Sequence, residues 1–186
     1  MNTLKLTDVE QKLEFTINPP VTMHYLHKLV EHAYNIKLDF DVFLPTKNRN
    51  LQRDFCWSLL QKQQLIISVL KDLTLTPISI ISYTDDSVAD SNRETIYKVI
   101  DGKQRLSTLI SFYNNEFPIE FNGNEYYYND FDALAKRRIK FFQFNAYIVY
   151  EYKTDMISDD NKIKWFEYIN FAGTPQDIEH LKQLKS

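Results

Sequence analysis

Apolar residues recur at helical spacing in six stretches of the chain. Met23 and Leu26 begin the first such series, shortly after a pair of prolines. Ser58 can cap a second helix, and Thr174 followed by Pro175 combines a capping residue with a first-turn proline. The pattern predicts helices over about 23–33, 58–73, 104–114, 132–140 and 160–171, and one from 174 onward.

Runs of β-branched and aromatic residues between these stretches predict strands. Leu38–Leu44 alternates apolar and polar residues before Pro45, which is typical of a half-buried strand. Ile78–Tyr83 and Thr95–Ile100 are separated by turn-forming residues and predict a hairpin with a long tip. Further strands are expected at 117–121, 125–128 and 144–152. This mixed order of helices and hairpins favours an α+β fold over a doubly wound sheet.

The composition is that of a folded, soluble protein. Hydrophobic residues make up 44% and charged residues 25% of the 186 positions, close to the average. No stretch approaches the ~20 consecutive apolar residues that span a bilayer, and the first residues lack the apolar run of a signal peptide. Cys56 is the only cysteine, which excludes an internal disulfide and a multi-cysteine zinc site. We therefore expect a single domain, 1–186, in the cytoplasm, or in the host cytoplasm if a phage encodes it.

Two polar clusters have a simple structural explanation. The net charge of -3 excludes a globally basic nucleic-acid binder, and the four cations at 136–138 and 140 fit a solvated helix face better than a nucleic-acid patch. His24 and His27 share a predicted helix, but no cysteine accompanies them. We therefore expect an ordinary amphipathic helix there and no metal site.

Glycine is unusually scarce. The chain has 3 glycines, where an average chain of this length carries roughly 13. Gly102, Gly123 and Gly173 should each therefore meet a need of the backbone. Gly102 is the most informative of them, because it joins a predicted strand to a predicted helix.

The turn around Gly102 has the residue types of an anion site. Asp101 and Gln104 are spaced as in a capping box at the start of the helix, which is sufficient as a purely structural role. The free N–H groups of a helix start favour an anion, and Lys103 and Arg105 add positive charge beside them. Asp101 can hold Mg²⁺ or position a water molecule. The sequence thus predicts phosphate recognition at this turn.

Four ordered motifs resemble one protein family. Asp101–Arg105 resembles the DGQQR signature of the ParB/sulfiredoxin-like domain that forms the N-terminal part of GmrSD-type modification-dependent restriction enzymes and of related phage-defence proteins. Upstream, Leu44–Pro45 and Leu51–Trp57 resemble the P-x-Q-R-x-x-W segment of that family, followed by its expected helix. Downstream, Asn170–Pro175 resembles its N-x-G-G-T-P-L turn. The resemblance covers nearly the whole chain.

The resemblance implies a fold, a ligand and a set of site residues. The fold is a ParB/sulfiredoxin-like mixed sheet flanked by helices, with residues 38–186 as the family core and 1–37 as an N-terminal extension with a helix. Such a domain binds a nucleoside triphosphate with Mg²⁺, hydrolyses it in characterised relatives, and regulates a nuclease that acts on modified or foreign DNA. Asp101, Gln104 and Arg105 would be catalytic, with Asp101 as the metal ligand. The implied nucleotide- and phosphate-binding residues are Gln52, Arg53, Gly102, Lys103, Arg105, Asn170 and Thr174.

The chain departs from the family pattern at several points. Lys103 replaces the first glutamine of the signature, and Ala172 replaces a glycine. Restriction-type relatives carry an HNH nuclease domain, and we expect no such domain within this chain. Sulfiredoxin chemistry is also not expected, because the signature turn holds Lys103 and Gln104 where the reactive cysteine belongs.

The residues leave two other functions open. Asp101 and Lys103 also match half of a metal-dependent nuclease motif, with Asp85, Asp86 or Asp90 as the upstream carboxylate. Alternatively, the chain is a non-catalytic phage inhibitor or protein-binding module on the same fold. The expected partner is a nucleotide, and DNA, a partner protein that supplies nuclease activity or a host defence protein are further candidates. A homodimer is also compatible with the sequence, and no membrane contact is expected.

Two arginines suggest a specific geometry for the ligand. Arg53 and Arg105 each follow a glutamine in the two motifs that most resemble the family. A guanidinium group on each side can hold one phosphate through paired hydrogen bonds. We therefore expect the two side chains to converge beside Asp101.

Overall fold

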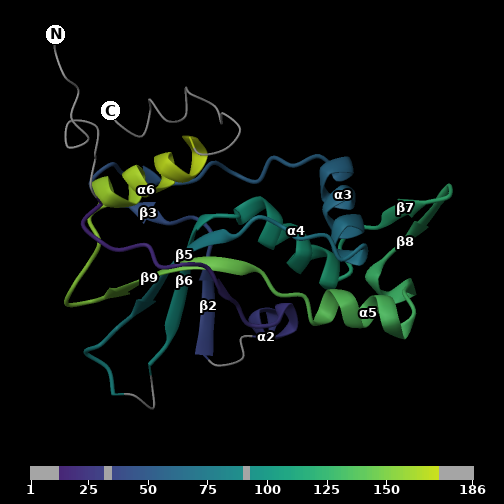
Figure 1. Ribbon diagram of the computed structural model, residues 1–186, viewed down its shortest axis with the longest axis horizontal. Coiled ribbons are helices and arrows are strands. Elements are labelled where there is room, and N and C mark those ends of the chain that lie inside the picture. Colours follow the sequence, from purple (N-terminus) through teal and green to yellow (C-terminus); the bar gives the residue numbers. More distant parts are fainter. Residues whose placement is uncertain (1–12, 32–34, 90–92, 172–186) are drawn as a thin grey trace, which may run out of the picture.

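The centre of the protein is a mixed five-stranded sheet with the strand order β1-β9-β5-β6-β2 (Figure 1). The computed structural model describes residues 13–31, 35–89 and 93–171. Strands β5 and β6 are antiparallel, whereas β2 runs parallel to β6 and β9 parallel to β5. The strand bounds are β1 Val21–Thr22, β2 Ile36–Asp39, β5 Ile78–Thr84, β6 Thr95–Asp101 and β9 Asn145–Tyr152.

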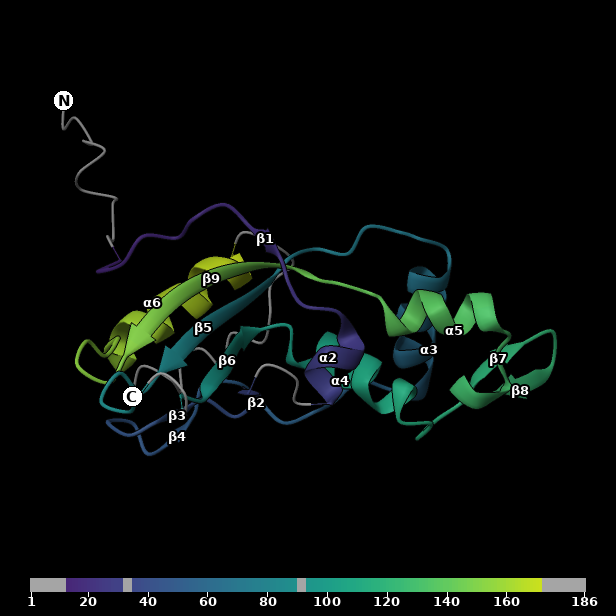
Figure 2. The same ribbon diagram turned by 90° about the horizontal axis from the view of Figure 1, so that it is seen from below.

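Helices cover both faces of this sheet. Helices α2, α3, α4 and α5 gather on one side of the sheet and beyond its end, and α6 crosses the opposite face (Figures 1 and 2). Their bounds are α2 Leu26–Val30, α3 Leu59–Leu70, α4 Lys103–Tyr113, α5 Ala133–Lys140 and α6 Asp159–Phe171. The expected α+β arrangement with flanking helices is confirmed. No helix in the described residues is long and apolar enough to cross a bilayer.

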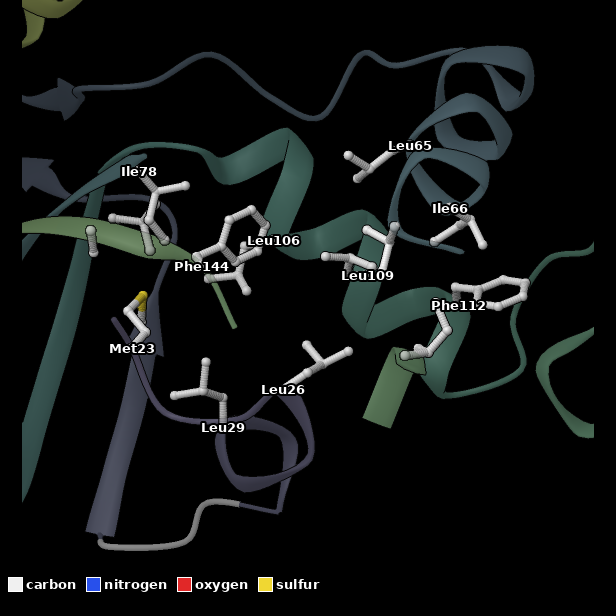
Figure 3. Packing of buried hydrophobic residues seen from close by; sticks show 14 of the residues in the cluster. Met23, Leu26, Leu29, Leu65, Ile66, Ile78, Leu106, Leu109, Phe112 and Phe144 are labelled. Carbon is white, nitrogen blue, oxygen red and sulfur yellow. The ribbon is translucent and has the colours of Figure 1, made fainter. Parts of the chain in front are cut away.

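Side chains on the two faces of β5 belong to two separate hydrophobic clusters. Ile80 belongs to the cluster that contains Leu106, Leu109 and other side chains of the four gathered helices. Figure 3 shows part of this cluster, with Ile78 of β5. Ile81, the neighbour of Ile80, lies in the second cluster, with Trp165 of α6. Ile80 and Ile81 are both fully buried. A sheet covered on both sides explains why two neighbouring residues of this strand, which point to opposite faces, are both apolar.

The prediction of one strand over 38–44 was wrong. Strand β2 ends at Asp39, and Phe43–Leu44 forms a separate strand, β3, that pairs with β4, Arg49–Asn50. Between them the backbone of Val42 has a φ of 40°. The Asp39 carboxylate accepts the N–H groups of Asp41 and Val42 at 2.9 and 3.1 Å. This local hydrogen bonding competes with the sheet and breaks the strand.

The segment before β2 is integrated into the fold. Strand β1 pairs with the start of β9, and the Met23 N–H donates to the Phe144 carbonyl oxygen at 2.8 Å. Leu26 belongs to the first hydrophobic cluster. His27 is buried, and its Nδ1 lies 3.0 Å from the Lys140 carbonyl oxygen. The described residues contain no cluster of potential metal ligands, and His32, the third histidine of the helix predicted over about 23–33, lies outside them.

Most of the remaining predictions are confirmed, although the helix predicted over about 23–33 is shorter, as α2 Leu26–Val30. The four later helices predicted up to residue 171 appear as α3, α4, α5 and α6, and Ser58 forms the expected N-cap of α3. Strands β7, Ile119–Phe121, and β8, Asn124–Tyr126, form a hairpin. Its turn residues Asn122 and Gly123 both have positive φ, as a type I′ turn requires. A short 3-10 helix, Tyr128–Asp130, follows, and the helix predicted from 174 onward lies outside the described residues.

Candidate functional site

Gly102 forms the junction between β6 and α4. Its φ is 104°, in the left-handed region that favours glycine. A Cβ added at this position would lie 2.8 Å from the Cβ of Ile78 and closer still to its Cγ2. Glycine is therefore required here both by the backbone conformation and by the close approach of β5.

Asp101 does not cap α4 as the sequence suggested. The N-cap residue is Gly102, and no side chain closes the helix start. Asp101 is the last residue of β6, and its carboxylate accepts from Arg105 Nη2 at 2.8 Å instead. The expected capping box is thus wrong, because the ion pair across one helical turn takes up the Asp101 side chain.

Both terminal nitrogens of the Arg105 guanidinium donate to acceptors of the protein. Beyond the bond to Asp101, Nη1 donates to the Thr76 carbonyl oxygen and, at 2.6 Å, to Thr76 Oγ1. Nη2 donates to the Pro77 carbonyl oxygen at 3.3 Å. This arrangement ties the first turn of α4 to the residues that lead into β5. Because both terminal nitrogens of its guanidinium donate to protein acceptors, Arg105 acts in this state as a positioning residue.

Gln104 fastens the segment that precedes α3. Its Oε1 accepts the N–H groups of Cys56 and Trp57 at 3.0 and 3.2 Å. Its Nε2 donates to the Asp54 carbonyl oxygen at 3.2 Å. Only an amide side chain offers a donor and an acceptor side by side in this way. Gln104 therefore sets the position of residues 54–57 relative to the Gly102 turn.

Gln52 and Arg53 have contrasting roles at the start of the same segment. Gln52 is half-buried and donates from Nε2 to the Val99 carbonyl oxygen, next to the turn. Arg53 is exposed, and no hydrogen bond or ion pair joins it to another described residue. Gln52 thereby anchors the segment to β6, and its neighbour Arg53 is a cation whose donors are available.

Lys103 is buried and already paired. Its side chain is only 8% exposed, and Nζ lies 3.1 Å from Asp41 Oδ1. Asp41 comes from the irregular stretch between β2 and β3, and its side chain is largely exposed. The sequence had indicated no role for Asp41, because nothing in the local pattern shows that residues 62 positions apart will meet.

Two of the four family-like motifs, Leu51–Trp57 and Asp101–Arg105, meet in one small pocket. Its volume is about 120 Å³, below the ~300–1,000 Å³ of a typical drug-sized ligand site. It can therefore enclose part of a nucleotide, such as a phosphate group. Trp57 and Phe166 supply apolar wall; the role of Phe166 was not predicted. The lining residues are Gln52, Arg53, Trp57, Asp101, Gly102, Lys103, Gln104, Arg105 and Phe166.

The two arginines that were expected to hold one phosphate reach the same pocket, but they differ in whether their hydrogen-bond donors are available. Arg53 and Arg105 both line it. The Arg105–Asp101 and Lys103–Asp41 pairs balance two of the three nearby positive charges. Arg53 supplies the third. The pocket thus has one cation available for an anionic ligand, and not the symmetric pair that we expected.

Asn170 lies apart from this pocket. It is buried in α6 and donates from Nδ2 to the Phe166 carbonyl oxygen at 2.7 Å, within its own helix. It is not among the lining residues, although Phe166 one turn earlier is. Thr174 and Gly173 lie outside the described residues.

The carboxylates of the nuclease alternative lie at the other end of the hairpin. Ser79 of β5 pairs with Asp101, whereas Asp85 follows the far end of the same strand. At ~3.3 Å per residue, six residues separate the two carboxylates by roughly 20 Å. Asp90 lies outside the described residues. The structure therefore does not bring Asp85 or Asp86 to Asp101 and Lys103.

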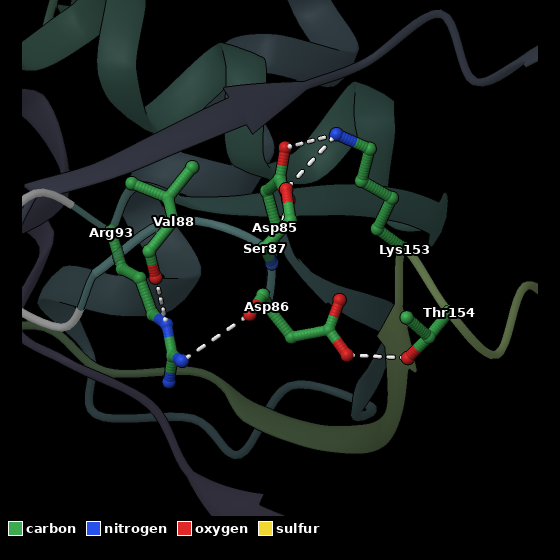
Figure 4. Close-up of polar contacts among 7 residues, drawn as sticks. All are labelled: Asp85, Asp86, Ser87, Val88, Arg93, Lys153 and Thr154. Carbon is green, nitrogen blue, oxygen red and sulfur yellow. Dashed lines mark hydrogen bonds and ion pairs between the residues drawn. The ribbon is translucent and has the colours of Figure 1, made fainter.

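Asp85 and Asp86 instead organise the hairpin tip (Figure 4). Hydrogen bonds from the Ser87 side chain and from Lys153 lower the pKa of Asp85, and the Asp85 contact raises the pKa of Lys153. Asp86 accepts from the Thr154 hydroxyl. These contacts tie the tip to the end of β9, which is a structural role.

Comparison with known proteins identifies one matching family. Residues 30–183 match the family described as the GmrSD restriction endonuclease, N-terminal domain. No curated protein and no solved structure matches the chain. The matched range contains all nine pocket residues and extends from the last residue of α2 past the end of α6. The chain belongs to the family of the GmrSD restriction endonuclease N-terminal domain.

Proposed function

We infer that this chain is a nucleotide-binding regulatory domain linked to DNA restriction and to conflict between phage and host. Membership of a family named after a restriction endonuclease supports the link to restriction. One observation supports a nucleotide as the ligand. The pocket combines an uncapped helix start with Arg53, a cation whose donors are available. Free backbone N–H groups and a guanidinium are the donors that bind phosphate oxygens.

Each pocket residue has a distinct part in this proposal. The first N–H groups of α4 and the Arg53 guanidinium bind a phosphate group of the ligand. Gln52, Gln104 and Arg105 hold the pocket walls in place through their contacts to backbone carbonyl and N–H groups. The base and sugar lie outside the enclosed volume, since about 120 Å³ holds only part of a nucleotide.

Mg²⁺ fits this pocket only as an ion held mainly by the ligand. Asp101 is the one carboxylate that lines the pocket, and one of its oxygens already accepts from Arg105. Mg²⁺ in nucleotide sites commonly takes one or two carboxylates together with phosphate oxygens and water. Asp101 would be the residue to hold it here, and the metal would supply neutralisation of phosphate charge during hydrolysis.

Substitution of Arg53 tests nucleotide binding. Loss of one charged hydrogen-bonding partner costs about 1.5–3 kcal/mol, so Arg53→Ala should weaken nucleotide binding roughly tenfold to a hundredfold. Thermal-shift titrations with the common nucleoside triphosphates, with and without Mg²⁺, measure this because a ligand raises apparent stability. The matched control is Arg137→Ala, an exposed arginine outside the pocket. Equal nucleotide responses in the two variants would rule out this pocket.

A second candidate function is nucleotide binding without turnover. The ion pair of Asp101 with Arg105 favours it, because that contact engages the only carboxylate of the pocket. Phosphate release from the parent chain and from Asp101→Asn separates the two functions. Release that disappears in the variant supports hydrolysis, whereas binding by both proteins with no release from either supports a non-catalytic regulator.

A further inference from the structure

The ion pair between Lys103 and Asp41 joins a buried cation to an exposed anion. The Lys103 side chain is 8% exposed, the Asp41 side chain is 67% exposed, and Nζ lies 3.1 Å from Oδ1. Within the described part of the chain, no other acceptor binds Lys103 Nζ. A buried ammonium group requires an opposite charge, whereas an exposed carboxylate can return to water at little cost. The lysine therefore depends on this contact far more than the aspartate does.

Asp41 lies beside the nucleotide pocket without lining it. Strand β2 runs parallel to β6 and ends at Asp39, so the residues that follow continue toward the turn at the start of α4. The Leu51 N–H donates to the Val42 carbonyl oxygen at 3.0 Å, which connects this stretch to the segment that forms one wall of the pocket. Lys103 itself lines the pocket. The ion pair is thus adjacent to the proposed phosphate site.

The Asp41 side chain can leave Lys103 without a change in its own backbone. The Asp39 carboxylate accepts the N–H groups of Asp41 and Val42 at 2.9 and 3.1 Å, and the Val42 side chain is buried. These contacts hold the backbone in place. A change of rotamer is then sufficient to move the Asp41 carboxylate into solvent. Another anionic group can take its position at the ammonium group of Lys103.

We propose that the phosphate chain of the ligand displaces Asp41 from Lys103, so that the pocket selects ligands with at least two linked phosphates. This inference rests on the nucleotide site proposed above. One phosphate binds the start of α4 and Arg53, and the next phosphate accepts from Lys103 Nζ in place of the Asp41 carboxylate. A single phosphate provides no second anionic group for the lysine, and Asp41 then stays in place. Asp41 is in this way a specificity-determining residue.

The departure of this chain from the family signature agrees with such a role. Lys103 stands where the signature has a glutamine, and a neutral amide would need no opposite charge. Together, Lys103 and Asp41 present little net charge to a ligand, but displacement of the carboxylate gives a phosphate chain a full positive charge to pair with. A purely structural ion pair has the opposite consequence, because loss of the carboxylate would loosen the turn and weaken the binding of every anion.

Calorimetric titrations of the full chain with inorganic phosphate, pyrophosphate and tripolyphosphate, without metal, test the proposal. Asp41→Asn removes the competing charge, and should tighten the binding of the two polyphosphates about three- to tenfold while changing that of inorganic phosphate less than about twofold. Asp41→Ala should act in the same way. Lys103→Met should weaken the binding of both polyphosphates, and in that background Asp41→Asn should have no further effect.

Asp72→Asn is the matched control, because it removes the same charge from an ion pair with Arg138 that lies outside the pocket. It should leave all three affinities unchanged. Equal tightening in Asp41→Asn and Asp72→Asn, or equal tightening for phosphate and pyrophosphate, would show an effect of net charge alone and overturn the proposal. Weaker binding of the polyphosphates by Asp41→Asn would show a structural ion pair and also overturn it.

Arg53→Ala separates the role of Asp41 from the existence of the site. If this variant binds all three anions more weakly than the parent and Asp41→Asn changes nothing, only the inference about Asp41 is wrong. If the parent binds none of the three anions, or if Arg53→Ala binds them as well as the parent does, the nucleotide site itself is wrong and the inference fails with it.

Discussion

Gly102 shows how a single position can serve the fold and the site together. The absence of a side chain lets β5 approach the turn, since the nearest atoms to an added Cβ would belong to Ile78. The same absence leaves the N–H groups at the start of α4 open to the pocket. A residue with these two constraints cannot be exchanged for a capping serine or aspartate, although either would stabilise an ordinary helix start.

Substitution of Gly102 by alanine should strongly destabilise the protein. The left-handed conformation costs about 1–2 kcal/mol for a residue with a Cβ, and overpacking adds about 1–3 kcal/mol, so Gly102→Ala should cost roughly 2–5 kcal/mol. Gly123→Ala is the matched control: its φ is also positive, at 74°, but no atom lies within 4 Å of the added Cβ. Urea denaturation of both variants measures the difference. Equal losses would show that contact with Ile78 contributes nothing.

The sequence identified the residues of the turn more reliably than their contacts. The scarcity of glycine and the signature around it indicated residues 101–105, all of which line the pocket. The partner of Asp101 was misassigned, because a capping box and an ion pair one turn apart require similar local spacing. The contact of Lys103 with Asp41 depends on tertiary structure and has no local signal.

At the scale of elements, the segment 52–57 is the wall of the pocket that depends most on side-chain contacts. It has no regular secondary structure, and Gln52 and Gln104 hold it from opposite sides. A loop held by a few hydrogen bonds opens more readily than a strand or a helix. The geometry of the Arg53 side chain relative to the turn therefore depends on these two amides.

Removal of the Gln104 amide should loosen this segment. Gln104→Ala leaves the N–H groups of Cys56 and Trp57 without their acceptor, and should cost about 1–2 kcal/mol of stability. Hydrogen exchange should accelerate in a peptide covering 54–57 and not in α4. Gln63→Ala is the control, because Gln63 donates to the Pro118 carbonyl oxygen away from the pocket. Unchanged exchange at 54–57 would mean that other contacts position the segment.

The alternation of apolar and polar residues led to one wrong strand prediction. The pattern over 38–44 suits one strand, yet hydrogen bonds from the Asp39 side chain divide it into β2 and β3. Helices α3 and α5 were placed well because both begin at a side chain that caps them, Ser58 and Asp132. Local sequence signals are reliable where a side chain caps the start of a helix. They fail where a side chain hydrogen-bonds to backbone groups that would otherwise continue a strand.

At the scale of the whole molecule, the sequence indicated the class of the fold but not the pairing of its strands. Strands β5 and β9 are separated by β6, α4, the β7–β8 hairpin and α5, yet they run parallel and adjacent. The neighbours Ile80 and Ile81 of β5 are both buried, on opposite faces, because helices cover both sides of the sheet. That arrangement depends on tertiary packing, which puts α6 and the other helices on opposite faces and leaves no local signal in the sequence.

A buried charge cluster joins α6 to the sheet. Glu151 of β9 is fully buried, and its carboxylate accepts from Lys98 of β6 and, at 3.0 Å, from Lys162 of α6. The Ile157 N–H donates to the same carboxylate at 3.0 Å. One carboxylate thus holds two lysines, from β6 and α6, and a backbone N–H group of the loop that precedes α6. Such a cluster contributes to stability only while every member is satisfied.

Neutralisation of Glu151 should therefore destabilise the whole protein. Glu151→Gln keeps the shape of the side chain but leaves Lys98 and Lys162 with no opposite charge, and breaking a buried pair in this way typically costs about 3–5 kcal/mol. Glu94→Gln is the matched control: Glu94 pairs with Lys37 in an exposed ion pair, for which the expected loss is about 0–1 kcal/mol. Urea denaturation gives both values. Unfolding of the parent should be a single transition, because Glu151 connects β6, β9 and α6 across the sheet that separates the two hydrophobic clusters. A loss of stability in Glu151→Gln as small as that in Glu94→Gln would contradict the prediction. It would mean that water reaches the charge cluster and that packing alone holds α6 on the sheet.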